Sequence, residues 1–545
     1  FSSVDLVTIR VEQDRAQPTD TTIKSPEERR LEPETAIGGS FNNASRTDVI
    51  LPSAVFDTVT SYAELRTVWK HTRQKFVTST EKLYLSGFSS DGDVDKIGCD
   101  DLRQTGYLDI ERSILLHDNI SQIALSVSSH PMIQEILDQT AHGVKIFEPH
   151  DLIESRLSQF AGSGVWLSQL NVYIVASRVV YTAPGTSWPT ISFLRGRVFD
   201  KNWRHLENYT IDWYGKTTTF PLLFEIPTVW WKDGSFFGPE DPRIVLEEGV
   251  QGAEPIIVFN MILNATGYPR VMWIFKPFSR IISYLRIRGE ERKPTEKNWA
   301  PFFYSYRADS ERKPSEHLYF VYSFNPLQVL KCKVDTGSCD WFYRATSSPD
   351  FPSLPHQDPH GEMRGGTNFV PVPLAGQSGL QFFVGFPRTH VQFCQSGSSY
   401  RPELVVMSAF DSEFRFIYAS VATDFGNAVL DQNELLHPCT TGAFLIPNSI
   451  LRWDHGPGED AMALSFSVAD ESIHIVNLHG MLDFIQDLPY VANSVTYGGD
   501  HNTPLQKSRW SVIEKEIISC AVDSAANSSR KDAIKTDMLS EELRN

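Results

Sequence analysis

Asn171-Val172-Tyr173-Ile174-Val175-Ala176 is the first of five short runs rich in β-branched and aromatic residues, a composition typical of strands. The other runs begin at Pro255, His317, Leu380 and Ser472, so that the five lie roughly 55–95 residues apart. Each run belongs to a set of three or four strand candidates separated by Gly, Pro, Asn and Asp turns. This spacing favours the blades of a β-propeller, and the residues alone leave a two-domain β-sandwich as the alternative.

The chain changes in composition along its length, and this predicts four parts. Helix-like patterns occur at Tyr62–His71 and Pro131–Ala141, and residues 521–545 suit a short surface helix or a loose tail. The parts that we predict are an extended, stem-like arm (1–50), a mixed α/β region with helices (51–160), the mainly β catalytic domain (161–520) and a polar C-terminal tail (521–545).

Composition excludes some classes of protein. The net charge of −17 over 545 residues argues against a surface that binds nucleic acid. Aromatic residues reach 12%, which suits both a β-rich core and stacking against sugar rings. No window of 18 apolar residues is present, so we expect no membrane span within the sequence. Because the chain begins with Phe1, we expect a signal or anchor segment to precede it.

Cysteines and glycosylation sequons indicate a secretory protein. There are six cysteines and no CxxC motif, so a zinc site is not expected. Cys332 and Cys339 flank a plausible hairpin, and we predict a disulfide between them. Asn-X-Ser/Thr sequons predict glycosylation on five side chains: Asn43, Asn119, Asn208, Asn264 and Asn527.

The segment with the most chemical character is Gly238-Pro239-Glu240-Asp241-Pro242-Arg243. Two prolines stiffen the backbone around the paired carboxylates. In an extended strand, Glu240 and Asp241 would point to opposite faces, and Arg243 would share the face of Asp241. The pattern therefore predicts an acid that moves a proton beside a fixed cation. From the pattern alone, a rigid acidic turn with a surface ion pair is equally compatible.

Further polar clusters follow along the chain. In a radial fold each blade contributes one loop to a central mouth, so these clusters are expected to converge there. The candidates for binding a diphosphate are Arg243, Lys297, Arg364, Arg388, His390 and Arg401. The candidates for contacting sugars are Trp231, Asn298, Trp299, Tyr400 and Asp460.

Other motifs give no support. Asp91-Gly92-Asp93 matches a short pattern that can hold a divalent metal, but nothing near it strengthens the match. The sequence has no P-loop, no dinucleotide-binding glycine motif and no GxSxG motif. We therefore predict no metal ligands and no bound cofactor.

Taken together, the motifs resemble a known family. The segment Gly238–Ile244 followed by Lys297-Asn298-Trp299, Arg364-Gly365-Gly366-Thr367 and Tyr400-Arg401-Pro402 is similar to fungal β-1,2-mannosyltransferases of the Candida and Pichia type, glycosyltransferase family 91. That resemblance covers about residues 50–520. The Glu240-Asp241-Pro242-Arg243 element also resembles the β-mannoside phosphorylases of glycoside hydrolase family 130, and there the likeness is confined to a few motifs.

The resemblance implies a fold and an activity. It implies a five-bladed β-propeller in a Golgi type II membrane protein that lacks its anchor here. The implied reaction transfers mannose from GDP-mannose to the 2-hydroxyl of a mannoside or cell-wall mannan and inverts the anomeric configuration. By similarity to the phosphorylases, Asp241 handles the proton, with Glu240 as the alternative, and the cations stabilise the leaving diphosphate. Because cations can do this without a metal, we expect no divalent ion to be required.

Two other functions remain open from the sequence. One is a β-mannoside phosphorylase or hydrolase, and the other is a carbohydrate-binding propeller without catalysis. Secretory features favour the transferase over a phosphorylase, and the stiff acid–arginine pair favours an enzyme over a binding module.

Overall fold

A computed structural model describes the larger part of the chain, and all of the described residues belong to one compact unit. The predicted arm 1–50, with Asn43, and the helix-like segments Tyr62–His71 and Pro131–Ala141 lie outside the described residues. So do Asp91, Asp93, Cys394 and Cys439. The described residues are 81–90, 98–129, 156–183, 186, 188–231, 234–304, 313–345, 361–374, 379–392, 398–423, 425, 429, 444–456, 458–497 and 510–527.

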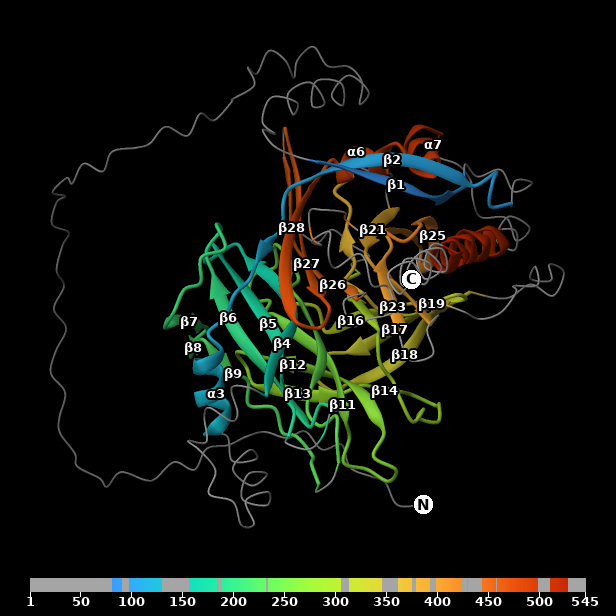
Figure 1. Cartoon of the computed structure of the whole chain (residues 1–545). Coiled ribbons are helices and arrows are strands. Elements are labelled where there is room, and N and C mark those ends of the chain that lie inside the picture. The colour runs from blue at the N-terminus through green and yellow to red at the C-terminus, as the bar shows by residue number, and fades with distance from the viewer. Residues whose placement is uncertain are drawn as a thin grey trace, which may run out of the picture. The chain divides into compact units, whose positions relative to one another are not determined.

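The described chain is mainly β, and each of the five runs found in the sequence forms a strand, in β5, β11, β16, β21 and β28 (Figure 1). One four-stranded sheet has the order β4 (Leu157–Leu167), β5 (Val172–Tyr181), β6 (Ile191–Phe199) and β9 (Leu222–Leu223). A second consists of β10 (Glu240–Val245), β11 (Ile256–Ile262), β12 (Arg270–Lys276) and β13 (Ile281–Tyr284).

Three further groups of strands complete the blade-like part. A five-stranded sheet has the order β14 (Arg286–Ile287), β18 (Ser338–Arg344), β17 (Leu327–Lys333), β16 (His317–Phe324) and β15 (Ala300–Phe302). A three-stranded sheet has the order β19 (Gly361–Arg364), β22 (Arg388–Gln392) and β23 (Ser398–Pro402). The hairpin of β7 (Tyr209–Trp213) and β8 (Lys216–Phe220) is separate from these sheets.

The remaining strands form one large sheet. Its order is β20 (Val370–Pro371), β21 (Gln381–Gly385), β24 (Val405–Phe410), β25 (Glu413–Ser420), β1 (Glu81–Ser89), β2 (Arg103–Ile110), β28 (Ser472–His479), β27 (Glu459–Val468) and β26 (Leu445–Gly456), and β3 (Ile114–Leu115) pairs with β28. The architecture is therefore a propeller-like arrangement of four blades with a nearly closed, barrel-like sheet.

This result corrects the expectation of five separate blades. The strand sets around Leu380 and Ser472 are joined, because β1 pairs with β25 and β2 pairs with β28. Gly87 lies opposite Ser420, and Asp109 lies opposite His479. An N-terminal hairpin thus bridges two sets of strands that the sequence suggested were independent. Its strands lie in the main sheet, so this part of region 51–160 is continuous with the β domain.

The core explains why the central strands are so apolar. Every residue of β5 and of β6 is buried, so these strands read as continuous hydrophobic runs instead of alternating ones. Helix α3 (Ile120–Ser128) begins at Asn119, whose side chain accepts a hydrogen bond from the backbone N–H of Gln122. Its buried residues Ile123 and Val127 pack in the same apolar cluster as Phe193 of β6.

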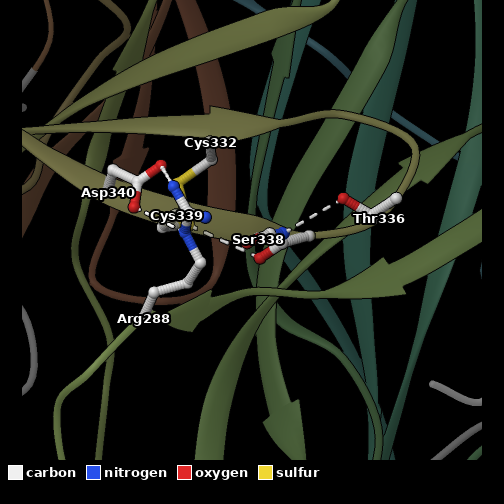
Figure 2. The surroundings of a disulfide bond; sticks show 7 residues. Arg288, Cys332, Thr336, Ser338, Cys339 and Asp340 are labelled. Carbon is white, nitrogen blue, oxygen red and sulfur yellow. Dashed lines mark hydrogen bonds and ion pairs between the residues drawn. A yellow bond between two sulfur atoms is a disulfide. The ribbon is translucent and has the colours of Figure 1, made fainter. Parts of the chain in front are cut away.

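Two disulfides lie within the described residues. Cys332 of β17 and Cys339 of β18 form the hairpin disulfide that the sequence predicted, with the ion pair of Arg288 and Asp340 beside it (Figure 2). A second disulfide joins Cys99 to Cys520, which are 421 residues apart in the sequence. Sequence spacing gave no signal for this long-range pairing.

The described residues of the C-terminal part include α6 (Met481–Gln486), α7 (Pro489–Tyr497) and a helix over residues 510–527. Trp510, Ile513 and Ile517 of the last helix belong to the main hydrophobic core. The predicted start of a polar tail at residue 521 therefore falls within a packed helix. None of the described helices is both long and apolar enough to cross a membrane.

Four of the five predicted glycosylation positions are described, and all four asparagines are exposed. Asn208 and Asn264 lie in loops, Asn119 is the cap of α3, and Asn527 ends the last helix. Exposure is what an attached glycan requires, so glycosylation at these positions stays a prediction.

Candidate active site

The acidic motif enters β10 through a strained backbone. Gly238 has a φ of +79°, and a Cβ there would lie 2.0 Å from the carbonyl oxygen of Ser192, so only glycine fits. Asp241 adopts a φ of +51°, which is uncommon for a residue with a side chain. The pairing of β10 with β11 shifts in register between Glu240 and Arg243. Strain of this kind gathers where the surrounding structure fixes a side chain for function.

The register shift in β10 makes one expectation wrong, namely that strand alternation directs the carboxylates of Glu240 and Asp241 to opposite faces. Arg178 of β5 lies 2.8 Å from a carboxylate oxygen of Glu240 and 4.0 Å from one of Asp241. One guanidinium therefore faces both acids. Side chains alternate between the two faces of a strand only where the backbone is regularly extended. The backbone of Asp241 is left-handed, so the alternation rule does not apply to Glu240 and Asp241.

The two acids differ in how firmly they are held. Arg178 contacts one carboxylate oxygen of Glu240, and Arg270 lies 3.0 Å from the other. The side chain of Glu240 is only 13% exposed. The side chain of Asp241 is 35% exposed, and Arg178 is its only ion-pair partner within 4.0 Å among the described residues. Asp241 is thus the acid that a bound molecule can reach.

Electrostatics separate the two acids further. Burial raises the pKa of Asp241, but the positive charges of Arg178, Arg388, Arg243 and Lys297 outweigh burial and hold that pKa below its usual value. Burial dominates at Glu240 and raises its pKa, against the opposing effect of Arg178 and Arg270. Asp241 is therefore ionised near neutral pH and able to accept a proton.

Arg243 is buried behind the acids. Its Nε donates to the carbonyl oxygen of Gly366, and its Nη1 donates to that of Pro242 over 2.8 Å. Burial and the nearby charge of Arg388 lower the pKa of Arg243 to about 9. Gly366 itself has a φ of +91°, which brings its backbone close to Phe386. Arg243 thus links β10 to the loop after β19 and adds positive charge behind Asp241.

Further predicted cations lie on one face of the sheet β19–β22–β23. The strand register places Arg364 opposite Arg388, and His390 opposite Tyr400. The His390 ring stacks on Tyr400, with 4.8 Å between their centroids. Burial lowers the pKa of His390, and the charges of Arg364, Arg388 and Lys297 lower it further. Since Arg388 and Lys297 also act on Asp241, this face and the acid pair form one site.

Arg388 has a donor group available. Its Nη2 donates to Oδ1 of Asn298 over 3.0 Å, which fixes the guanidinium. Its Nη1 is buried and has no hydrogen-bond partner among the described residues. A buried guanidinium N–H without a partner is costly, and a bound oxyanion would satisfy it.

The structure does not bring every predicted residue to this site. Arg401 lies opposite Thr389 in the register, so alternation places it on the other face of the sheet from Arg388 and His390. Asp460 accepts hydrogen bonds from Trp453 Nε1 and from the backbone of Leu482, both over 2.8 Å. It lies near the start of β27 (Glu459–Val468), whereas Asp470, on which the charge of Asp241 acts, follows the other end of that strand. Asp460 is therefore a structural residue here.

The two predicted tryptophans have different environments. Trp299 is buried and packs edge-on against Phe320 at 5.7 Å, so its ring is part of the core. Trp231 is 40% exposed and packs against Phe237 and Tyr268. Only Trp231 offers an accessible ring surface for stacking on a sugar.

Three site residues were missed by sequence reasoning. Arg178 and Arg270 hold Glu240, and Arg178 could have been noticed as a lone cation within the apolar strand Val172–Tyr181. Asp470 lies in the turn between β27 and β28, where no sequence pattern marks it. Burial raises the pKa of Asp470 to about 6, and the charge of Asp241 raises it too, which places the two carboxylates near each other. Among the described residues, no group of three His, Cys, Asp or Glu side chains could hold a metal ion.

A strained, accessible carboxylate among arginines, set in a propeller-like β fold, is an arrangement that could move a proton beside an anionic group of a bound molecule. The sequence gives the particular family: residues 98–267 and 276–528 match the family of beta-mannosyltransferases, and the chain belongs to that family.

Similar proteins are known from two yeasts. The chain is 31% identical over 406 residues to beta-mannosyltransferase 2 of Komagataella phaffii, covering 72% of this chain and 61% of that protein. It is 32% identical over 358 residues to beta-mannosyltransferase 3 of Candida albicans, covering 61% and 60%. The chain thus spans about three fifths of the length of these relatives. A GDP-Man-dependent mannosyltransferase from Leishmania mexicana has a related structure, with a TM-score of 0.34, 10% identity and coverage of 60% of this chain and 86% of that one.

Proposed function

We propose that this protein transfers mannose from GDP-mannose to the 2-hydroxyl of a terminal mannose in mannan or a related mannoside, forming a β-1,2 linkage. The observation that carries the proposal is that the ionised, accessible Asp241 lies within electrostatic reach of Arg388, whose buried Nη1 has no hydrogen-bond partner among the described residues. Membership of the beta-mannosyltransferase family supports the choice of sugar. The donor and the linkage come from the resemblance of the motifs to the fungal β-1,2 enzymes.

The proposed reaction is a single displacement. The acceptor oxygen bonds to the anomeric carbon of mannose, and the bond from that carbon to the GDP oxygen breaks on the opposite face. The acceptor proton passes to Asp241, directly or through a sugar hydroxyl. An α-linked donor then gives a β-linked product, so the configuration inverts.

The cations act on the leaving group. Arg388, Arg364, Lys297 and His390 would bind the diphosphate, and preorganised donors of this kind lower a barrier by several kcal/mol when charge develops on the leaving oxygen. Arg243 contributes a buried positive charge behind Asp241. Glu240 forms ion pairs with Arg178 and Arg270 and so holds both side chains in place. No divalent ion is required in this proposal, because the arginines neutralise the diphosphate.

The cellular setting is part of the proposal. Disulfides and exposed sequons are consistent with a lumenal or secreted domain. We propose the Golgi lumen, because the motifs resemble those of the fungal β-1,2-mannosyltransferases.

One assay tests the function. The protein is incubated with GDP-mannose and a mannobiose acceptor, with and without a chelator, and the product is examined by NMR for a β-1,2 linkage. We expect product and GDP in equal amounts in both conditions. Product that forms only from phosphate and a mannoside would favour a phosphorylase instead, and sugar binding without turnover would favour a carbohydrate-binding protein.

A further inference from the structure

A basic cavity of about 600 Å³ lies on the five-stranded sheet, over β14, β18, β17 and β16. The whole chain has a net charge of −17, so its composition gives no reason to expect positive charge to gather at one place. Among the residues that line the cavity, Asp340 is the only carboxylate. Five basic side chains line it: Arg286, Arg288, His317, Lys331 and Lys333.

The strand register places the basic side chains of β16 and β17 on one face of the sheet. Lys331 and Lys333 are two residues apart on β17, so they share a face. His317 of β16 lies opposite Lys333, and Asp340 of β18 lies opposite Lys331. Residues directly opposite each other in neighbouring strands project from the same face, so these four side chains stand together.

The arginines approach the same face from the other side of β18. Arg286 of β14 lies opposite Ser338, which is two residues before Asp340 on β18. Arg288 is two residues after Arg286, and its Nε donates to Oδ1 of Asp340 over 2.6 Å. Ile287 between the two arginines is buried on the opposite face. Lysines and arginines therefore flank β18 on its two sides.

A disulfide fixes the floor of the cavity. Cys332 lies between the two lysines of β17, and Cys339 lies between Ser338 and Asp340 on β18. Both cysteines are buried on the face away from the cavity, where their disulfide joins the two strands (Figure 2). The backbone that carries the cations is thus held in place before any ligand binds, which lowers the entropic cost of binding.

The positive charge of the cavity is only partly compensated. Asp340 forms its ion pair with Arg288. Arg286, Lys331 and Lys333 form no ion pair with any of the described residues. Three cations without a counter-charge repel one another, and a bound anion would relieve that repulsion.

Two carboxylates that are adjacent in sequence to lining residues do not change this balance. Asp335 lies in the hairpin turn and pairs with Lys276 over 2.8 Å. Glu316 precedes His317, and its charge raises the pKa of that imidazole. Burial and the charge of Lys331 outweigh this effect and lower the pKa of His317. The cavity therefore remains positive where His317 lies.

The geometry of the donors suits a ligand with two linked phosphate groups. Neighbouring strands lie about 4.8 Å apart, so the strands that flank β18 are about 10 Å apart. The long side chains of Arg286 and Lys333 can reach inward from these strands toward Ser338, whose hydroxyl is a further donor. A diphosphate can contact both sides at once, and the volume is in the range of sites for small molecules.

This cavity is separate from the candidate active site. None of its lining residues is among the groups whose charges act most on Glu240 or Asp241. In the sheet order, β14 is at one edge, whereas β15, the strand near β10, is at the other. A ligand over β18 therefore does not occupy the acid pair.

We propose that this basic cavity binds a small molecule that carries a diphosphate group. The proposal goes beyond the transferase function and does not depend on it. The phosphate oxygens would lie over Ser338, between Arg286 on one side and the two lysines on the other.

Protection of lysines from acetylation by inorganic pyrophosphate tests the site directly. The whole protein is treated with acetic anhydride, and mass spectrometry measures the acetylation rate of each lysine. We expect pyrophosphate to slow acetylation of Lys331 and Lys333 several-fold and to leave the exposed Lys201 and Lys216 unchanged. Sodium chloride at the same ionic strength should give no protection. Equal rates at all four lysines with and without pyrophosphate would overturn the proposal.

Paired substitutions give an independent measurement by calorimetry. They are made in an Arg388→Met background, which weakens diphosphate binding at the candidate active site. Changing both Lys331→Met and Lys333→Met keeps the apolar stems and removes two charges, and we expect the Kd for pyrophosphate to rise about tenfold. Changing both Lys201→Met and Lys216→Met removes the same charge elsewhere and should leave the Kd unchanged. Equal rises in the two pairs would mean a general charge effect and would refute the site.

Two further probes identify the source of the diphosphate. GDP should protect Lys331 and Lys333 as strongly as pyrophosphate if the ligand is a nucleotide, and less strongly if it is a bare diphosphate. Vesicles with an anionic phospholipid that protect these lysines when neither soluble compound does would overturn the proposal in favour of a membrane contact. Asp241→Asn should keep the protection, so a failure of the transferase function would leave this site standing.

Discussion

Two acid–arginine clusters use arginines of the neighbouring strands β5 and β6, on opposite faces of the sheet, and they differ in one decisive respect. In the first cluster, Oδ2 of Asp118 forms ion pairs with Nε of Arg195 over 2.9 Å and with Nε of Arg197 over 3.1 Å. All three side chains are at most 2% exposed. In the second, Arg178 faces Glu240 and Asp241, and Asp241 keeps 35% of its side chain exposed. The first cluster is closed to any ligand, whereas the second is open.

The contrast shows what separates a structural ion cluster from a reactive one. Gln159 also donates to Asp118, so the carboxylate has its hydrogen bonds made within the protein. Its pKa is lowered because the charges of Arg197 and Arg195 outweigh burial. Asp241 has a lowered pKa as well, so that shift alone does not identify a catalytic acid. An arginine with unpartnered nitrogens does not identify one either, because Arg197 beside Asp118 has them too. The exposure of Asp241 and its left-handed backbone are what distinguish it from Asp118.

The largest expected effect is on turnover. Asp241→Asn keeps the shape of the side chain and removes its ability to accept a proton. We expect kcat to fall by about 10³–10⁴-fold, with the melting temperature within a few degrees of the wild type. Initial rates of GDP release, measured with mannobiose as acceptor, check this. A rate within tenfold of wild type would mean that Asp241 is not the base.

A substitution in the closed cluster of Asp118, Arg195 and Arg197 should lower the stability of the protein and leave its turnover nearly unchanged. Asp118→Asn leaves Arg195 and Arg197 buried without a counter-charge, and breaking a buried pair costs about 3–5 kcal/mol in the free energy of unfolding. Denaturant unfolding measures the loss. The fraction that remains folded should keep a kcat within a few-fold of wild type. An unchanged free energy of unfolding would remove the structural role assigned to Asp118.

A third change probes the diphosphate side. Arg388→Met removes the unsatisfied Nη1 donor, and we expect kcat to drop by about 10²–10³-fold, together with weaker GDP binding. Arg401→Met, on the opposite face of the same sheet, is the matched control and should have little effect. Equal losses in the two variants would indicate that the sheet is perturbed generally.

The smallest expected effect is a change in pH dependence. Asp470 has a pKa raised to about 6, so it gains negative charge as the pH rises through 6. That charge makes Asp241 a stronger base, so kcat/KM should increase by a few-fold across this range. Asp470→Asn should give a flat profile there. For stability the sign is opposite: a raised carboxyl pKa favours the fold at low pH, and this contribution declines from about pH 4 to 6.

Several features were predictable because they depend on local sequence. The β-branched runs predicted the strands, since such side chains fit a half-buried pleated surface. The segment Gly238–Arg243 likewise directed attention to the candidate site. The hairpin of Cys332 and Cys339 was predictable for the same reason, because both partners lie in one short segment.

What could not be predicted depends on distant partners or on backbone detail. The pairing of β1 with β25 and the bond between Cys99 and Cys520 join residues hundreds of positions apart, and spacing carries no information about them. The left-handed conformation of Asp241 breaks the alternation on which the face assignment rested. Arg178, Arg270 and Asp470 lie outside the segment Gly238–Arg243 in the sequence, and only the folding of the chain brings them to the candidate site.

The most direct test of this account is to compare Asp241→Asn with Glu240→Gln in one preparation series, measuring kcat and the Kd for GDP-mannose. Glu240 is held by two arginines, so its variant should weaken binding or turnover through lost positioning, and it should retain measurable transfer. Asp241→Asn should bind GDP-mannose with nearly unchanged Kd and transfer almost nothing. The reverse order, with Glu240→Gln inactive and Asp241→Asn active, would contradict the account and make Glu240 the base.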